Sequence, residues 1–229
     1  MALPAIRTLA PRLWVADRPL KTAPMTDIGA RMTVVQLSDG GLFLHSPVRL
    51  DDRTRAALDP LGPVRFIVAP SRVHHLFVAD YFTAYPAARI YAAPGLQEKR
   101  GALQFHGILS DEAPAEWKAD LAQHLFRGAP FLSEVVFFHA ESRTLILTDL
   151  AFNVPAGKTS DARLFYWLVG AAGRFGPHRL IRLFIRDRKA ARTSVDTILR
   201  WDFDRVVVSH GEVLETAGRE RFAAAFAFL

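Results

Sequence analysis

The chain has 229 residues, half of them apolar and 11% aromatic, which is enough to build a folded core and excludes a largely disordered protein. It contains no cysteine, which excludes disulfide frameworks, thiolate zinc sites, iron–sulfur clusters and cysteine nucleophiles. The 29 basic and 23 acidic residues give a moderate net charge of +6.

The first half of the chain alternates short apolar strands with helical segments. Residues 38–41 (Ser-Asp-Gly-Gly) have turn chemistry and predict a hairpin between the strands on either side. We expect strands at Leu13–Ala16, Met32–Leu37, Leu42–Leu44, Val64–Val68 and Ile90–Ala92. We expect helices at Asp51–Leu61, at His75–Tyr85 and from Pro94 onward.

The second half repeats this order. A second hairpin is predicted from Phe137-Phe138 and Leu145–Leu147. A long helical region is expected over Asp161–Trp201, then a strand at Arg205–Val208 and a helix at Gly218–Phe228. Hairpins mixed with strand–helix alternation favour two stacked sheets with helices outside them.

No targeting or membrane segment stands out. The first 14 residues lack the continuous apolar stretch and cleavage site of a signal peptide. The longest apolar run, Leu164–Gly173, is shorter than the roughly 20 residues of a membrane-spanning helix. We therefore expect a soluble, cytoplasmic protein.

Several catalytic templates are absent from the sequence: the G-x-S-x-G elbow, the P-loop, G-x-G-x-x-G and H-E-x-x-H. Histidine and aspartate instead follow three apolar strands. Val64–Val68 leads to His74 and His75, Leu145–Leu147 leads to Asp149, and Arg205–Val208 leads to His210. Polar groups collected at strand ends are a common way to build a ligand site.

Two segments carry a family resemblance, Glu134–Phe152 (EVVFFHAESRTLILTDLAF) and Val206–Gly211 (VVVSHG). They are similar to the strand–turn–strand segment and the final strand of the metallo-β-lactamase superfamily, in particular a domain-of-unknown-function branch with a degenerate metal motif. The resemblance implies an α+β fold, a four-layer αββα sandwich with the site at one edge, and one domain over residues 1–229.

The metal motif departs from the superfamily pattern. Aligned with the pattern Thr-His-x-His-x-Asp-His, the chain has Ala69 in place of the threonine, and Pro70 and Arg72 in place of the first two histidines. The first metal position is therefore lost. Gly128-Ala129-Pro130 stands where a further histidine is usual, and Ser46 stands at or near the place of a supporting aspartate.

The second metal position retains ligands. The resemblance implies one divalent ion, zinc or iron, held by His74, His75, Asp149 and His210, with Asp149 also orienting a water molecule. Four protein ligands would close a tetrahedral zinc site, so catalysis with zinc requires one of them to stay out, whereas a six-coordinate ion such as Fe(II) or Mn(II) would keep open positions. Arg72 is a candidate for binding an anionic substrate group, or else forms a salt bridge.

Two functions follow from this pattern. The first is a metal-dependent hydrolase of a small ester-like or anionic substrate. The alternative is a catalytically inactive member of the fold that acts as a binding or structural protein. The basic surface of Arg179–Arg192 is then a candidate contact for nucleic acid or an anionic membrane, or simply a solvated helix face. We expect His139 to face solvent or cap a turn, and His106, His124 and His178 to lie at the surface or on helices.

Overall fold

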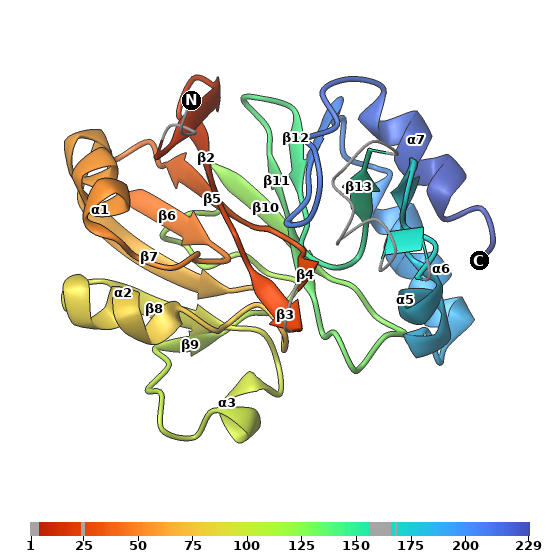
Figure 1. Ribbon diagram of the computed structural model, residues 1–229, viewed down its shortest axis with the longest axis horizontal. Coiled ribbons are helices and arrows are strands. Elements are labelled where there is room, and N and C mark those ends of the chain that lie inside the picture. The colour runs from red at the N-terminus through yellow and green to blue at the C-terminus, as the bar shows by residue number, and fades with distance from the viewer. Residues whose placement is uncertain (1–4, 24–25, 156–165, 168) are drawn as a thin grey trace.

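The computed structural model describes residues 5–23, 26–155, 166–167 and 169–229, which form two large sheets flanked by helices (Figure 1). The seven-stranded sheet contains, in spatial order, β1 (Arg7–Ala10), β2 (Leu13–Arg18), β5 (Ala30–Gln36), β6 (Leu42–His45), β7 (Val64–Ala69), β8 (Arg89–Ala92) and β9 (Gly107–Ile108). The four-stranded sheet contains β10 (Leu121–Leu125), β11 (Val135–His139), β12 (Thr144–Ile146) and β15 (Arg205–Val207).

The remaining elements are helices and two small sheets. The helices are α1 (Asp52–Leu58), the 3-10 helix η1 (Asp59–Leu61), α2 (Val78–Ala84), α3 (Leu96–Lys99), α5 (Arg179–Phe184), α6 (Arg188–Ile198) and α7 (Gly218–Ala225). The small sheets pair β3 (Lys21–Ala23) with β4 (Thr26–Asp27) and β13 (Phe152–Val154) with β14 (Arg174–Gly176). In the described part of the chain, no helix combines the length and the apolar character needed to cross a membrane. The cytoplasmic location and the single domain over 1–229 stay predictions.

Strand periodicity builds the layers, because successive side chains of a strand point to opposite faces of its sheet. On β5, Val35 packs into the core between the sheets, whereas Val34 packs into the core beneath α1 and α2. On β11, Phe137 belongs to the core between the sheets, whereas Phe138 packs with residues of α6 and α7.

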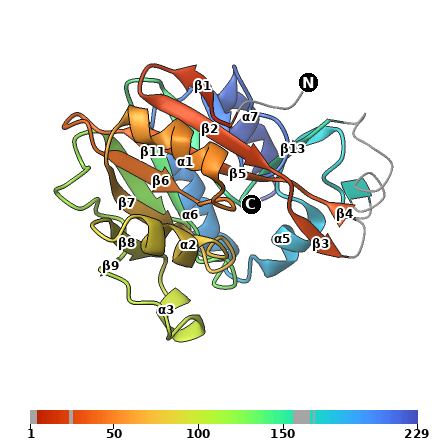
Figure 2. The same cartoon turned by 60° about the vertical axis from the view of Figure 1, so that its left-hand side comes forward.

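The result is the predicted four-layer αββα sandwich. In Figure 1 the two sheets stand in the middle, with α1 and α2 on one side and α6 and α7 on the other. Figure 2 brings α1 and α2 forward, and both lie across the strands of the seven-stranded sheet. The fold class and the hairpins around residues 38–41 and 140–143 are therefore confirmed.

The long helix predicted over Asp161–Trp201 is wrong. Residues 161–165 and 168 lie outside the described residues. Tyr166 and Trp167 are helical, and the chain from Ala172 onward forms the strand β14 followed by the separate helices α5 and α6. Gly173, just before β14, and Gly176, its last residue, have φ of 73° and 136°, outside the helical region. Pro177, which follows directly, lacks the N–H of a helix interior.

Candidate metal centre

The three predicted strand ends meet in one place. His74 lies in the loop after β7, Asp149 follows β12 by three residues, and His210 follows β15 by three residues. Strands β12 and β15 run parallel, as do β6, β7 and β8, so the carboxyl ends within each set share one edge of the sheet. This geometry gathers residues that are far apart in the sequence.

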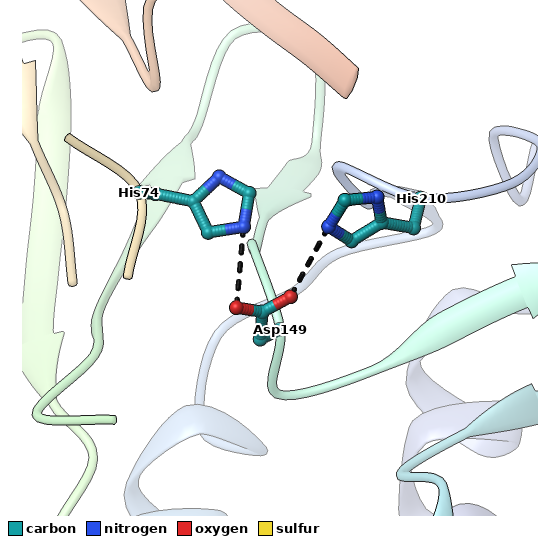
Figure 3. Close-up of side chains that lie close together, drawn as sticks. All are labelled: His74, Asp149 and His210. Carbon is teal, nitrogen blue, oxygen red and sulfur yellow. Dashed lines mark ion pairs between the residues drawn. The ribbon is translucent and has the colours of Figure 1, made fainter. Parts of the chain in front are cut away.

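Asp149 lies between the two imidazole rings (Figure 3). His74 Nε2 is 3.2 Å from Asp149 Oδ2, and His210 Nε2 is 3.2 Å from Asp149 Oδ1. One ligand atom from each of the three residues lies within 4.8 Å of the others. Two imidazoles and one carboxylate are a common donor set for zinc and for non-haem iron.

Hydrogen bonds behind the rings fix their orientation. His210 Nδ1 is 2.8 Å from the carbonyl oxygen of Gly29, which can only accept, so Nδ1 must donate. A neutral His210 ring therefore points an unprotonated Nε2 at the carboxylate of Asp149. Two acceptors at 3.2 Å need a positive charge between them, either a second proton on the ring or a metal ion.

The distances also fit a shared ion. Donor atoms bound to one tetrahedral zinc ion at 2.0–2.1 Å lie roughly 3.3 Å apart. Both nitrogen–oxygen separations at Asp149 are close to that value. Because Nδ1 of His210 is already engaged by Gly29, the ring is oriented in the way that metal-ligating histidines usually are.

The electrostatics favour a charged carboxylate. Burial alone would raise the pKa of Asp149, but the attraction of His74 and the hydrogen bonds of His210 and His74 together hold it well below its ordinary value. Burial likewise opposes protonation of His74, yet the charge and hydrogen bond of Asp149 outweigh it and raise the pKa of His74. The site therefore attracts positive charge.

Glu134 supports the loop that carries Asp149. Its buried carboxylate accepts hydrogen bonds from the backbone N–H groups of Thr148 (2.6 Å), Asp149 (2.9 Å) and Leu150 (2.9 Å). Burial and the charge of Asp149 raise the pKa of Glu134 to about 7, against the lowering effect of its hydrogen bonds. The sequence resemblance included Glu134 only as the beginning of a segment, and its role became visible in the folded loop.

A second set of contacts supports the loop that carries His210. The buried guanidinium of Arg31 donates to the carbonyls of Val208 (2.8 Å) and Gly211 (2.9 Å), and its Nε donates to Asp17 (2.7 Å). Gly211 has a φ of 96°, and a Cβ there would lie 2.2 Å from the carbonyl oxygen of Asn153. Glycine is therefore required directly after His210.

His75, the fourth predicted ligand, is not part of the cluster. It lies beside the site and contributes to the same cavity, but the three-residue cluster does not include it. Burial and the charges of Lys99 and Arg100 lower the pKa of His75 to about 4, so the ring is neutral. With three ligands rather than four, a tetrahedral ion would keep one position open, as catalytic zinc sites do.

Arg72 is not brought to the cavity. Its side chain lies over Gly95, and its Nη1 is 3.4 Å from the carbonyl oxygen of Pro130. Among the described residues, no lysine or arginine lines the cavity. The described part of the cavity wall thus offers an anionic substrate group no cationic side chain.

Two residues near the site were missed as functional candidates. His178 was expected at the surface or on a helix, but its ring packs 4.6 Å from that of Phe152 and lines the cavity. Its Nδ1 accepts the backbone N–H of Ile181 and caps α5, a role that its place just before an apolar helix could have suggested. Burial lowers the pKa of His178 to about 4.

Ser46 is the second missed residue. Its hydroxyl is 2.7 Å from Nδ1 of His74, so it contacts the ring on the side opposite Asp149. The residue is buried and has a φ of 55°, a left-handed conformation that is uncommon outside glycine. The sequence comparison noted only that a serine stood near the place of a carboxylate.

The other histidines lie elsewhere. His139 is fully buried on β11, where its Nδ1 is 2.7 Å from Ser142 Oγ, so the expectation of a solvent-facing residue is wrong and the contact with the turn is confirmed. His124 is buried on β10, where its Nδ1 pairs with Asp111 at 3.0 Å, so the expectation of a surface or helical residue is wrong. His106 is exposed, as expected.

Three of the six basic residues in the segment Arg179–Arg192 contact other residues of the chain. The guanidinium of Arg182 lies 4.3 Å from the ring centre of Phe228, and Arg188 also contacts Phe228. Arg192 pairs with Asp196 one turn further along α6. A nucleic-acid or membrane partner for this segment stays a prediction.

A cavity of about 320 Å³ opens over the cluster. Its walls include Ser46, His74, Asp149, His178 and His210 together with mostly apolar side chains. The volume is at the lower end of the roughly 300–1,000 Å³ of small-molecule sites.

Comparison with known proteins gives a family for the sequence and relatives for the fold. The sequence matches the family described as Domain of unknown function (DUF4336) over residues 12–164. Comparison with curated proteins gives no match.

Solved metallo-β-lactamases share the fold. The enzyme from Erythrobacter litoralis is 14% identical with a TM-score of 0.69, and the match covers 100% of this chain and 99% of that one. The enzyme from Pontibacter korlensis is 12% identical with a TM-score of 0.66, covering 98% and 99%. The mono-zinc form of FIM-1 from Pseudomonas aeruginosa is 15% identical with a TM-score of 0.65, covering 97% and 92%.

Proposed function

Because this chain belongs to the DUF4336 family and has the metallo-β-lactamase fold, we propose that it is a hydrolase of small ester-like substrates in which His74, Asp149 and His210 hold one divalent metal ion. The observation that carries the proposal is the 3.2 Å contact of His210 Nε2 with Asp149, because Nδ1 of this ring is bound to Gly29 and a positive charge is needed between Nε2 and the carboxylate. A divalent ion satisfies both at once, and the mono-zinc form of FIM-1 is a protein of this fold with one zinc ion.

The residues of the chain have separate tasks in this proposal. A bound divalent ion supplies positive charge that polarises a carbonyl group and lowers the pKa of water. Asp149 would hold the ion through its carboxylate, whose Oδ2 faces His74 and whose Oδ1 faces His210, and would orient a water molecule beside it. In this proposal the Ser46 hydroxyl accepts a hydrogen bond from Nδ1–H of His74, which leaves Nε2 of that ring free to bind the ion. The carbonyl oxygen of Gly29 does the same for His210.

The first experiment is elemental analysis of the full chain purified without chelator or a histidine tag. We expect about one equivalent of zinc, iron or manganese per chain, because three donors of this type make a strong site. Hydrolysis of p-nitrophenyl acetate should stop when a chelator removes the ion and return when the ion is added back. A chain that contains no ion and takes none up would contradict the proposal.

A second candidate function has its own observation. Ser46, His74 and Asp149 form a continuous chain of contacts, 2.7 Å and 3.2 Å long, in the order of a serine-hydrolase triad. In that route the Ser46 hydroxyl attacks the acyl carbon, its proton moves to His74 Nδ1, and the alcohol leaves with that proton. Water then releases the acid and restores Ser46.

The two routes use His74 in opposite ways. Metal binding needs an unprotonated Nε2, whereas the serine route needs Nε2 to carry a proton donated to Asp149. Replacing Ser46 by alanine should therefore leave the rate of metal-dependent hydrolysis within about tenfold of the wild type. A loss of this size is typical when a metal-binding histidine loses the hydrogen-bond partner behind it. The serine route would be favoured instead if Ser46→Ala lost all hydrolysis and the wild-type protein kept its activity in the presence of the chelator.

A further inference from the structure

Most of the described residues that line the cavity over the cluster are apolar. Thirteen of its nineteen lining residues are apolar. The polar ones are Ser46, His74, His75, Asp149, His178 and His210. Along the described part of the wall, a substrate therefore meets mainly hydrocarbon, and three of the six polar side chains are the proposed metal ligands.

Several of these apolar side chains are exposed and have room to gain contacts. Leu76, Phe131 and Leu180 line the cavity and are 55%, 51% and 44% exposed. Large apolar side chains beside a pocket are a typical mark of a ligand site. They come from the loop after β7, the loop before β11 and helix α5, so three distant segments contribute to one apolar wall.

One aromatic pair strengthens this wall. Phe131 stacks on Phe184 with ring centres 4.3 Å apart and planes inclined by 23°. Both residues line the cavity. The stack joins α5 to the loop before β11, and it presents a flat hydrocarbon surface to a ligand.

We infer that the cavity binds the acyl chain of a hydrophobic ester, with the ester carbonyl directed at His74, Asp149 and His210. The inference rests on the proposed function, since it uses the same three residues. The small volume restricts the acyl group to a short or medium length. Hydrolysis adds water across the C–O bond and yields the carboxylic acid and the alcohol.

The test measures binding without turnover. Methyl alkyl ketones, from methyl propyl to methyl heptyl ketone, carry a carbonyl group and cannot be hydrolysed. Their dissociation constants, measured by ligand-observed NMR on the full chain, should fall about fourfold per added methylene until the cavity is filled. A series in which affinity does not change with chain length would overturn the inference.

A matched pair of variants on α5 locates the binding. Leu180→Ser should weaken binding of the longest ketone about fivefold, as expected for removing part of an apolar wall. Leu183→Ser is the control, because Leu183 lies one turn away on the same helix, is 74% exposed and does not line the cavity. Equal effects of the two substitutions would show that the ketone binds elsewhere.

The outcomes separate this inference from the proposed function. Chain-length-dependent binding in a protein without metal or ester hydrolysis would refute the hydrolase and leave the apolar site in place. Metal-dependent hydrolysis with equal kcat/KM for acetate and longer esters, and equal ketone affinities, would refute only the apolar site.

Discussion

Replacing His210 by alanine should abolish metal retention and ester hydrolysis together. The substitution removes one of the three proposed donors. Removing only the hydrogen-bond partner of a metal ligand already lowers metal affinity about 10–100-fold, so we expect metal affinity to fall about 100-fold or more. Elemental analysis after gel filtration should fall from about one ion per chain to none. His210→Ala that keeps the wild-type metal content would refute the proposed ligand set.

The matched control is His139→Ala. His139 is also a buried histidine, but it lies on β11 and its ring contacts Ser142 rather than Asp149. Its replacement should leave the metal content of the folded protein unchanged. Loss of metal in this variant would mean that the wrong histidines have been assigned. A thermal melt of both variants distinguishes lost ligands from lost folding.

Replacing Glu134 by alanine should destabilise the protein strongly and displace Asp149. The substitution leaves the backbone N–H groups of Thr148, Asp149 and Leu150 without their acceptor in the interior. Buried donors without partners cost about 1–3 kcal/mol each, and water entering the vacated space recovers part of this, so we expect a loss of about 3–5 kcal/mol. For a chain of this length that lowers Tm by roughly 10 °C.

The comparison for this prediction is Glu141→Ala in the turn between β11 and β12. Glu141 is exposed and pairs with Arg12 at the surface, where ion pairs contribute little. The Tm of the Glu141→Ala variant should stay close to that of the wild type. If Glu134→Ala and Glu141→Ala melt alike, the hydrogen bonds of Glu134 do not hold the Asp149 loop.

Much of the fold could be predicted because its determinants are local. Apolar runs and turn residues predicted both hairpins and the order of strands and helices. Hairpins mixed with strand–helix alternation favoured two stacked sheets with helices outside them, and Val34 and Val35 on β5 do pack into cores on opposite faces of their sheet. The predicted Asp161–Trp201 helix failed because apolar and basic residues continue through the segment, whereas Gly173, Gly176 and Pro177 interrupt the backbone.

The sequence pointed to the three residues that cluster, but not to which of the further candidates join them. Histidine or aspartate at three strand ends identified His74, Asp149 and His210, because the carboxyl ends of parallel strands share an edge. The local sequence of His74-His75 gave no means of choosing between two adjacent histidines. Neighbouring side chains in a loop diverge, and only the fold shows that His74 meets Asp149 while His75 lies beside Lys99 and Arg100.

The sequence alone thus determined the layers, the succession of strands and helices along the chain and the chemical character of the site, since these depend on local patterns and residue type. The tertiary structure decided the rest: a cluster of three candidate ligands that does not include His75, Arg72 outside the cavity, and Ser46 and Glu134 in contact with the His74 ring and the Asp149 loop. These features depend on contacts between segments far apart in the chain. Hydrogen bonds need donor and acceptor atoms about 3 Å apart, so which residues pair is determined only once the sheets have packed.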